Sequence, residues 1–173
     1  LSYNQQFGSN PNIDGIHIHI YAWNTGGPGT SLVGVSSGQL LNSARSQLSA
    51  WRTFTSTEQS WLKNKEFWIT ETGVLSADVP DAVMADFMKK WLGYIATQSY
   101  VNRAFWFVNN VQSTRLDLWG IRSSALYRDM QPSGLVGTFR TECGKYCPRI
   151  NFPVPPTPTP VPTPVPTPIP TPT

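Results

Sequence analysis

The sequence predicts an α/β fold in which helices cover a parallel sheet. Three segments have the pattern of β-strands, at residues 12–23, 66–70 and 103–109, and a segment of helical pattern follows each of them. Strands that alternate with helices are typical of βαβ units, whose strands lie parallel in one sheet. A closed (β/α)8 barrel needs about 250 residues. Three units therefore form either a small open sheet or the last three units of such a barrel.

The first strand, in "NIDGIHIHIYAW", has two different faces. Isoleucines fall on one face and polar rings on the other: Ile16, Ile18 and Ile20 against His17, His19 and Tyr21. Alternate residues of a strand point to opposite faces of the sheet. We therefore expect one face to pack in a core and the other to be lined by imidazole and phenol groups.

The second and third strands, "EFWIT" and "RAFWFVN", are apolar on both faces. Continuous apolar runs of this length are typical of parallel strands that are buried between two layers. We therefore expect both strands to be buried on both sides.

Residues 38–64 have a helical pattern, in two pieces. Leu40, Leu41, Leu48 and Trp51 fit the first piece, and the second would begin at a capping box. In such a box a Ser side chain and a Gln three residues later each bond the other's backbone N–H, and Ser56 with Gln59 has that spacing.

Two further helices are expected after the second and third strands. Asp78, Pro80 and Asp81 form a helix-start signal. Apolar residues then recur at spacings of three and four between Val83 and Ile95, and "PSGLVGTFRT" predicts a short terminal helix.

Composition and charge exclude several classes of function. Charged residues make up 13% and aromatic residues 12% of the chain, and the average soluble protein has roughly 25% charged residues. The formal charge is +3 and the longest basic run is Lys89-Lys90, whereas nucleic-acid binders have a clustered basic face. No apolar run approaches the roughly 18 residues of a membrane span. We expect no nucleic-acid partner, no membrane span and no cofactor.

The last 21 residues, 153–173, are eleven Pro, six Thr, three Val and one Ile. Proline at nearly every second position prevents helix and sheet, so this segment is predicted to be a disordered polyproline II linker of roughly 65 Å. Pro-Thr linkers are common in exported proteins. We expect a globular domain at 1–152, a linker at 153–173, a secreted or cell-surface location and a further module beyond the linker. A ligand for a proline-recognition domain is the alternative.

Two cysteines, Cys143 and Cys147, stand close together in "CGKYC". In an oxidising compartment they can form a disulfide around a three-residue loop, and two reduced thiols are the alternative. A metal site is disfavoured because no histidine or further cysteine lies nearby.

Polar side chains stand at the carboxyl ends of the three strands, where barrel enzymes carry their functional residues. The first strand ends in His-Ile-Tyr, the second at Glu71 in "WITETG", and the third at Trp106 to Asn109. This order resembles the sixth to eighth strands of the retaining glycoside hydrolases of the large barrel clan that includes family 5 cellulases and mannanases. "LYRDMQPSGLVG" is similar to the segment before that clan's last helix, so the resemblance covers residues 12 to about 140.

The resemblance implies a chemistry and a role for each residue. Retaining enzymes use two carboxyl groups about 5 to 5.5 Å apart, one as nucleophile and one as acid/base. Glu71 would be the nucleophile and Tyr21 the residue that orients it. His19 would bond a sugar hydroxyl or join the same network, and Trp106 would offer an apolar platform to the β-linked sugar chain. Apart from the resemblance, Trp23, in the glycine-rich loop after the first strand, and Asn109 are further candidates for substrate contact. His17 is expected to be structural.

The clan's acid/base Glu, which follows an Asn on the fourth strand, has no counterpart here because the sequence contains no Asn-Glu pair. The other glutamates are not suitable acid/base residues: Glu58 lies in a predicted helix, Glu66 at the start of a strand and Glu142 near the cysteines. The arginine of an early strand is also missing, and Leu1 lies just ahead of the expected sixth strand. We therefore expect an N-terminally truncated barrel of strands six to eight, incomplete as an enzyme by itself.

Alternatives remain for both residues and function. Glu71 can instead cap a helix or form a salt bridge, and Trp106 can be ordinary core. The "HIH" pattern also begins the metal site of amidohydrolase barrels, but those sites need further ligands and the chain has no third histidine. Besides the hydrolase, the candidates are a non-catalytic carbohydrate-binding module on a Pro-Thr stalk and a structural extracellular domain.

Overall fold

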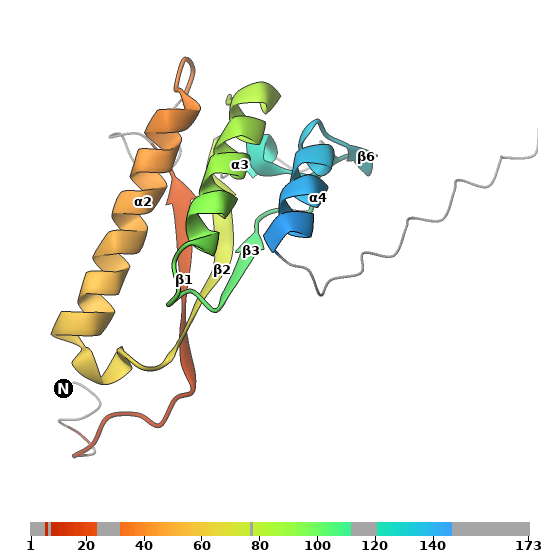
Figure 1. Ribbon diagram of the computed structural model, residues 1–173. Helices are drawn as coiled ribbons and strands as arrows, with labels where there is room; N and C mark the ends of the chain where they lie inside the picture. The colour runs from red at the N-terminus through yellow and green to blue at the C-terminus, as the bar shows by residue number, and fades with distance from the viewer. Residues whose placement is uncertain (1–5, 7, 24–31, 77, 112–120, 147–173) are drawn as a thin grey trace, which may run out of the picture.

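The computed structural model describes most of the globular part of the chain (Figure 1). The described residues are 6, 8–23, 32–76, 78–111 and 121–146. The predicted linker at 153–173 lies outside them. So does Cys147, and with it the predicted disulfide to Cys143.

A three-stranded parallel sheet forms the centre of the fold. Its strands are β1 (Gly15–Ala22), β2 (Glu66–Val74) and β3 (Arg103–Trp106), in the order β1-β2-β3. The predicted α/β fold with a parallel sheet is confirmed. Because neighbouring strands run in the same direction, their carboxyl ends meet at one edge of the sheet.

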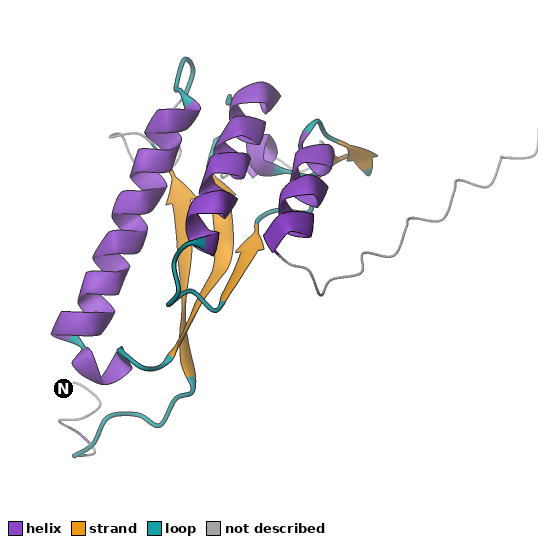
Figure 2. Cartoon of the chain, viewed as in Figure 1, coloured by secondary structure: helices purple, strands orange, loops and turns teal. Residues whose placement is uncertain are grey.

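Three helices form one layer on one face of this sheet, as Figure 2 shows. They are α2 (Ser37–Thr53), α3 (Asp81–Ala96) and α4 (Leu135–Tyr146). A short π-helical turn η1 (Phe54–Glu58) and a 3-10 turn η2 (Ser60–Leu62) follow α2. Among the described residues, no helix is both long enough and apolar enough to cross a membrane.

The core lies between the helix layer and the sheet. The stripe predicted on α3 is confirmed, because its apolar residues are buried: Met84, Phe87, Met88, Trp91 and Ile95. On β1, Ile18 and Ile20 are buried while His17 and His19 are exposed, as the alternation predicts.

A capping box begins α2, whereas the sequence predicts one at the start of the second helical piece. The capping box is formed by Ser36 and Gln39, whose side chains each accept a hydrogen bond from the other's backbone N–H. The box predicted at Ser56 and Gln59 is wrong. Ser56 instead lies within η1, and its hydroxyl donates to the carbonyl of Thr53.

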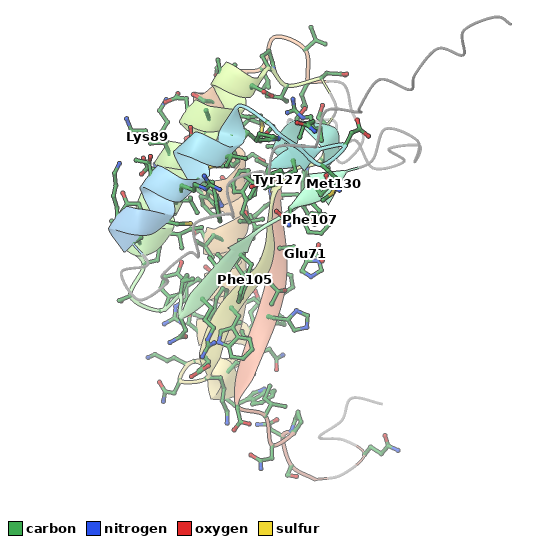
Figure 3. All side chains as sticks on the ribbon, turned by 90° about the vertical axis from the view of Figure 1, so that its right-hand side faces the viewer. Glu71, Lys89, Phe105, Phe107, Tyr127 and Met130 are labelled. Carbon is green, nitrogen blue, oxygen red and sulfur yellow. The ribbon has the colours of Figure 1, made fainter. Side chains whose placement is uncertain are left out.

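The other face of the sheet is open among the described residues. The described helices cover one face only, and Figure 3 shows side chains projecting from the other face. On β3, Arg103, Ala104 and Phe105 are exposed, Phe105 to 51%. The prediction that β2 and β3 are buried on both sides is therefore wrong, since β2 also has half-buried residues on its open face. An edge strand with one covered face has fewer neighbours than the central strand of a two-sided sheet.

A small second sheet follows the main one, formed by β4 (Asn110–Val111), β5 (Tyr127–Arg128) and β6 (Gln131–Pro132). β5 and β6 form a hairpin whose two turn residues have positive φ angles, 51° at Asp129 and 63° at Met130. Two successive positive φ angles are typical of the type I′ turn of tight hairpins. This hairpin leads directly into the predicted and observed terminal helix α4.

Candidate active site

Glu71, Tyr21 and His19 meet on the open face of the sheet. The hydroxyl of Tyr21 donates a hydrogen bond to Glu71 Oε2, and His19 Nδ1 lies 3.4 Å from the same oxygen. β1 and β2 pair so that His19 stands opposite Glu71. The structure therefore brings together three of the residues that the sequence places at strand ends.

The environment of Tyr21 keeps its hydroxyl protonated. Burial of the ring raises the pKa of Tyr21 far above its ordinary value, and the hydrogen bond to the Glu71 carboxylate raises it further. A protonated phenol donates a hydrogen bond, and an ionised carboxylate accepts one. The side chain of Glu71 is 32% exposed, so a ligand in solvent can reach the carboxylate.

Both contacts of Glu71 involve the same oxygen. Tyr21 and His19 approach Oε2, and within the part of the chain that the structure describes no hydrogen bond to Oε1 is present. One oxygen of the carboxylate is thus held by Tyr21 and approached by His19. The other is left without a hydrogen bond from the described residues.

Phe107 is a site residue that the sequence prediction missed. It follows β3, and its backbone N–H donates to Thr72 O at 2.8 Å. Its ring packs edge-on against Tyr21, with centroids 6.0 Å apart and planes at 80°. Figure 3 shows Phe107 and Glu71 on the side of the sheet that faces away from the helices. Alternation along the strand places Phe107 on the face opposite Trp106, but it does not tell which of the two faces meets the helices.

Trp106 points to the other side of the sheet. It pairs with Thr72, which is fully buried and accepts a hydrogen bond from Trp91 of α3. The ring of Trp106 lies 6.1 Å from that of Phe87, centroid to centroid, and the indole N–H of Trp106 donates to Ser124 O at 2.8 Å. The structure does not bring Trp106 to Glu71. Because successive strand residues alternate between faces, Trp106 packs on the core and Phe107 takes the place predicted for it.

Gly73 allows a close approach at the end of β2. A Cβ at this position would lie 2.6 Å from the carbonyl oxygen of Phe107 and 2.9 Å from Ser124 Oγ. The hydroxyl of Ser124 also accepts from Val74 N at 2.7 Å and donates to Val74 O at 2.9 Å. The glycine two places after Glu71 thus lets the segments that carry Phe107 and Ser124 pack onto the end of β2.

The remaining predicted residues lie at the borders of this group. Trp23 follows β1, and its backbone N–H donates to Ser43 Oγ at 3.2 Å. Asn109 accepts a backbone hydrogen bond from Tyr127 at 2.7 Å. The contacts described for them are with Ser43 and Tyr127 rather than with Glu71, so their substrate-binding roles stay predictions.

Four of the described carboxylates elsewhere have partners of their own. They accept hydrogen bonds from cationic or indole groups: Glu66 from Trp68, Asp81 from Arg128, Asp86 from Lys90 and Glu142 from Lys145. In the described ranges none of these four pairs includes Glu71. The part of the chain that the structure describes contains no group of three or more His, Cys, Asp or Glu residues that could hold a metal ion.

Comparison with known proteins gives a family for most of the chain. The family model described as "Glycosyl hydrolase catalytic core" matches residues 2–118. No curated protein matches the sequence.

Solved structures with a similar fold include a GH128 (subgroup I) endo-β-1,3-glucanase from Amycolatopsis mediterranei. Its complex with laminaritriose is 20% identical, with a TM-score of 0.47, and the match covers 80% of this chain and 48% of that chain. A mutant of the same enzyme with laminarihexaose is 17% identical, with a TM-score of 0.46 and the same coverage. The chain spans about half the length of these structures.

Proposed function

Because the chain belongs to the glycosyl hydrolase catalytic core family, we propose that it carries the nucleophile of a retaining glycoside hydrolase. The proposed substrate is a β-linked polysaccharide or oligosaccharide, and the bond hydrolysed is its O-glycosidic bond. The single observation that supports this best is the Glu71 carboxylate, which is held at Oε2 by Tyr21 and approached by His19 on the open face of the sheet.

In the proposed mechanism, Glu71 Oε1 attacks the anomeric carbon and forms a covalent glycosyl-enzyme. A second carboxyl group protonates the departing glycosidic oxygen and then removes a proton from the water that releases the sugar. Tyr21 donates to Oε2 throughout, which keeps the carboxylate aimed and limits its rotation. Phe107 offers the sugar an apolar ring beside Tyr21.

We also propose that the three β/α units are part of a closed (β/α)8 barrel. In such a barrel the sheet face opposite the helices is the interior, and here that face is uncovered and carries exposed rings such as Phe105. The second carboxyl group would come from another strand of the barrel. The Pro-Thr composition of 153–173 supports a secreted or cell-surface location, which fractionation of the producing cells into medium and cytoplasm would test.

The nucleophile is tested in the full-length native protein with a panel of β-linked glucans, mannans and xylans. Glu71→Gln removes the charge and keeps the shape, so turnover of any panel substrate should fall by at least about 1000-fold, since covalent catalysis is lost. A 2-deoxy-2-fluoro glycoside of the accepted sugar should label the wild-type protein, and peptide mass spectrometry should find the label on Glu71. The product released first should be the β-anomer by NMR.

Glu66→Gln is the matched control, because Glu66 lies on the same strand and bonds Trp68. It should turn over substrate within about twofold of the wild type, as surface changes usually have small effects. Full activity in Glu71→Gln, or a label on another residue, would contradict the proposal. A wild-type protein that binds glycans without hydrolysing any of them would favour the non-catalytic carbohydrate-binding module.

A further inference from the structure

β2 contains one residue more than its neighbours can pair with. β1 and β2 stay in step from Gly15↔Glu66 to Ile18↔Ile69, and the next pair is His19↔Glu71. The register therefore skips Thr70. On the other side, Ile69 pairs with Ala104 and Thr72 with Trp106, so three steps along β2 correspond to two along β3. Thr70 is the extra residue of a β-bulge that both neighbouring strands accommodate.

The bulge reverses which residues of β2 face the helices. Phe67 and Ile69 are buried against the core, at 2% and 0% exposure. Regular alternation would place Glu71 on that same buried side. After the bulge it is Thr72 that is buried, where it bonds Trp91, and Glu71 stands on the open face opposite His19. An ionised carboxylate among the apolar residues of α3 would be strongly destabilising.

The side chain of Thr70 is bonded on the open face. Its Oγ1 lies 3.1 Å from His17 Nδ1 and 3.5 Å from the carbonyl oxygen of Ile18. A hydroxyl that donates to the Ile18 carbonyl can accept from the Nδ1–H of His17, so the two contacts are compatible. They connect the extra residue of β2 to the β1 residues just before the register changes.

We propose that Thr70 and His17 are positioning residues: they hold the bulge of β2, and the bulge sets Glu71 against Tyr21 and His19. The inference rests on the proposed role of Glu71 as nucleophile. Neither residue touches the Glu71 carboxylate in this arrangement. They act through the course of the β2 backbone, and thereby on the angle at which the carboxylate meets the anomeric carbon.

The test compares paired variants in the full-length native protein. Thr70→Val removes the hydroxyl and keeps the branched shape, whereas Thr70→Ser keeps the hydroxyl. His17→Phe removes the ring nitrogens, whereas His17→Asn keeps a nitrogen at the place of Nδ1. We expect Thr70→Val and His17→Phe each to lower kcat about 10-fold or more, because a small misplacement of a reacting group is costly. KM should change less than about twofold, since both residues act on the reacting carboxylate.

Rescue by the conservative variants separates positioning from general damage. Thr70→Ser and His17→Asn should each recover most of the wild-type kcat. The double variant Thr70→Val/His17→Phe should be no slower than the slower single variant, because both changes remove one interaction. If Thr70→Val fails to fold, the His17 pair carries the test alone.

Three results would overturn the inference, and the first two of them can be told apart. If Glu71→Gln abolishes turnover while Thr70→Val and His17→Phe both keep the wild-type kcat, the positioning role is wrong and the proposed function stands. If Glu71→Gln itself keeps wild-type turnover, the proposed function fails and the inference fails with it. A crystal structure of Thr70→Val in which Glu71 still meets Tyr21 and His19 unchanged would also overturn it.

Discussion

Gly73 lies directly against the carbonyl group of Phe107: a Cβ on Gly73 would be 2.6 Å from that oxygen. Phe107 in turn packs edge-on against Tyr21, the residue that holds Glu71. The small size of Gly73 therefore lets the end of β2 pack against Phe107, whose ring contacts Tyr21 in the candidate site.

Gly73→Ala should lower both the free energy of unfolding and the kcat of the full-length protein. The new methyl group forces the Phe107 carbonyl or the β2 backbone to move, at a cost of about 1–3 kcal/mol. The control is Gly137→Ala, because a Cβ at Gly137 in α4 meets nothing within 4 Å. That change should leave stability the same or raise it by up to about 1 kcal/mol. Urea unfolding measures both, and equal stabilities for the two variants would contradict the assigned contact.

Tyr21→Phe should lower kcat about 10- to 100-fold with a smaller change in KM, because the hydroxyl orients the nucleophile rather than the substrate. Tyr100→Phe is the control, since Tyr100 packs against Phe67 away from Glu71 and should keep the wild-type kcat. Steady-state kinetics on the accepted glycan gives both values. Equal kcat in the two variants would argue against an orienting role.

Stability at alkaline pH should depend on Tyr21. Burial and the Glu71 hydrogen bond raise the pKa of Tyr21 in the folded protein, while the unfolded chain loses this proton near pH 10. Above that pH the unfolded state binds fewer protons than the folded state, so the free energy of unfolding falls as pH rises. Below about pH 10 the contribution is fully present.

Denaturant unfolding between pH 8 and 11 checks this expectation. In Tyr21→Phe, the free energy of unfolding should fall less steeply with rising pH than in the wild type. Burial also raises the pKa of Tyr100, so some decline should remain in Tyr21→Phe and should diminish further in the Tyr21→Phe/Tyr100→Phe double variant. A Tyr21→Phe curve parallel to that of the wild type would contradict the prediction.

Trp106→Ala and Phe107→Ala should have opposite profiles. Trp106 packs on Phe87 and bonds Ser124 on the core side, so its loss should cost about 2 kcal/mol or more of stability. Phe107 lies on the open face with Tyr21, so its loss should mainly weaken glycan binding or turnover. The free energy of unfolding and the steady-state kinetics, measured for both variants, test these two profiles. A larger kinetic loss in Trp106→Ala, at unchanged stability, would reverse the assignment of faces.

The helices were predictable from sequence because their periodicity is regular. The apolar residues of α3 recur at spacings of three and four, and they are the ones that α3 buries. The alternation of β1 likewise separates Ile18 and Ile20 from His17 and His19. Capping was harder, since Ser36–Gln39 and Ser56–Gln59 have the same spacing and only the first begins a helix. The local sequence pattern does not show which of these two Ser–Gln pairs stands at the first turn of a helix.

The candidate site was partly predictable. Glu71, Tyr21 and His19 come together because residues at the carboxyl ends of neighbouring parallel strands must be close. The bulge at Thr70 could not be foreseen, because an extra residue in a strand leaves no period of its own in the sequence. The choice between Trp106 and Phe107 depended on the face of β3 that meets the helices, and only the pairing with Thr72 decides it.

The open face of the sheet also affects how these residues behave as a separate polypeptide. The half-buried Trp68 and the exposed Phe105 lie on it, and β1 and β3 are the outer strands of the main sheet among the described residues. Unprotected strand edges and bare aromatic surface promote self-association. Recombinant production of residues 1–173 alone should therefore yield insoluble material, and solubility should improve when a polypeptide that covers this face is co-expressed.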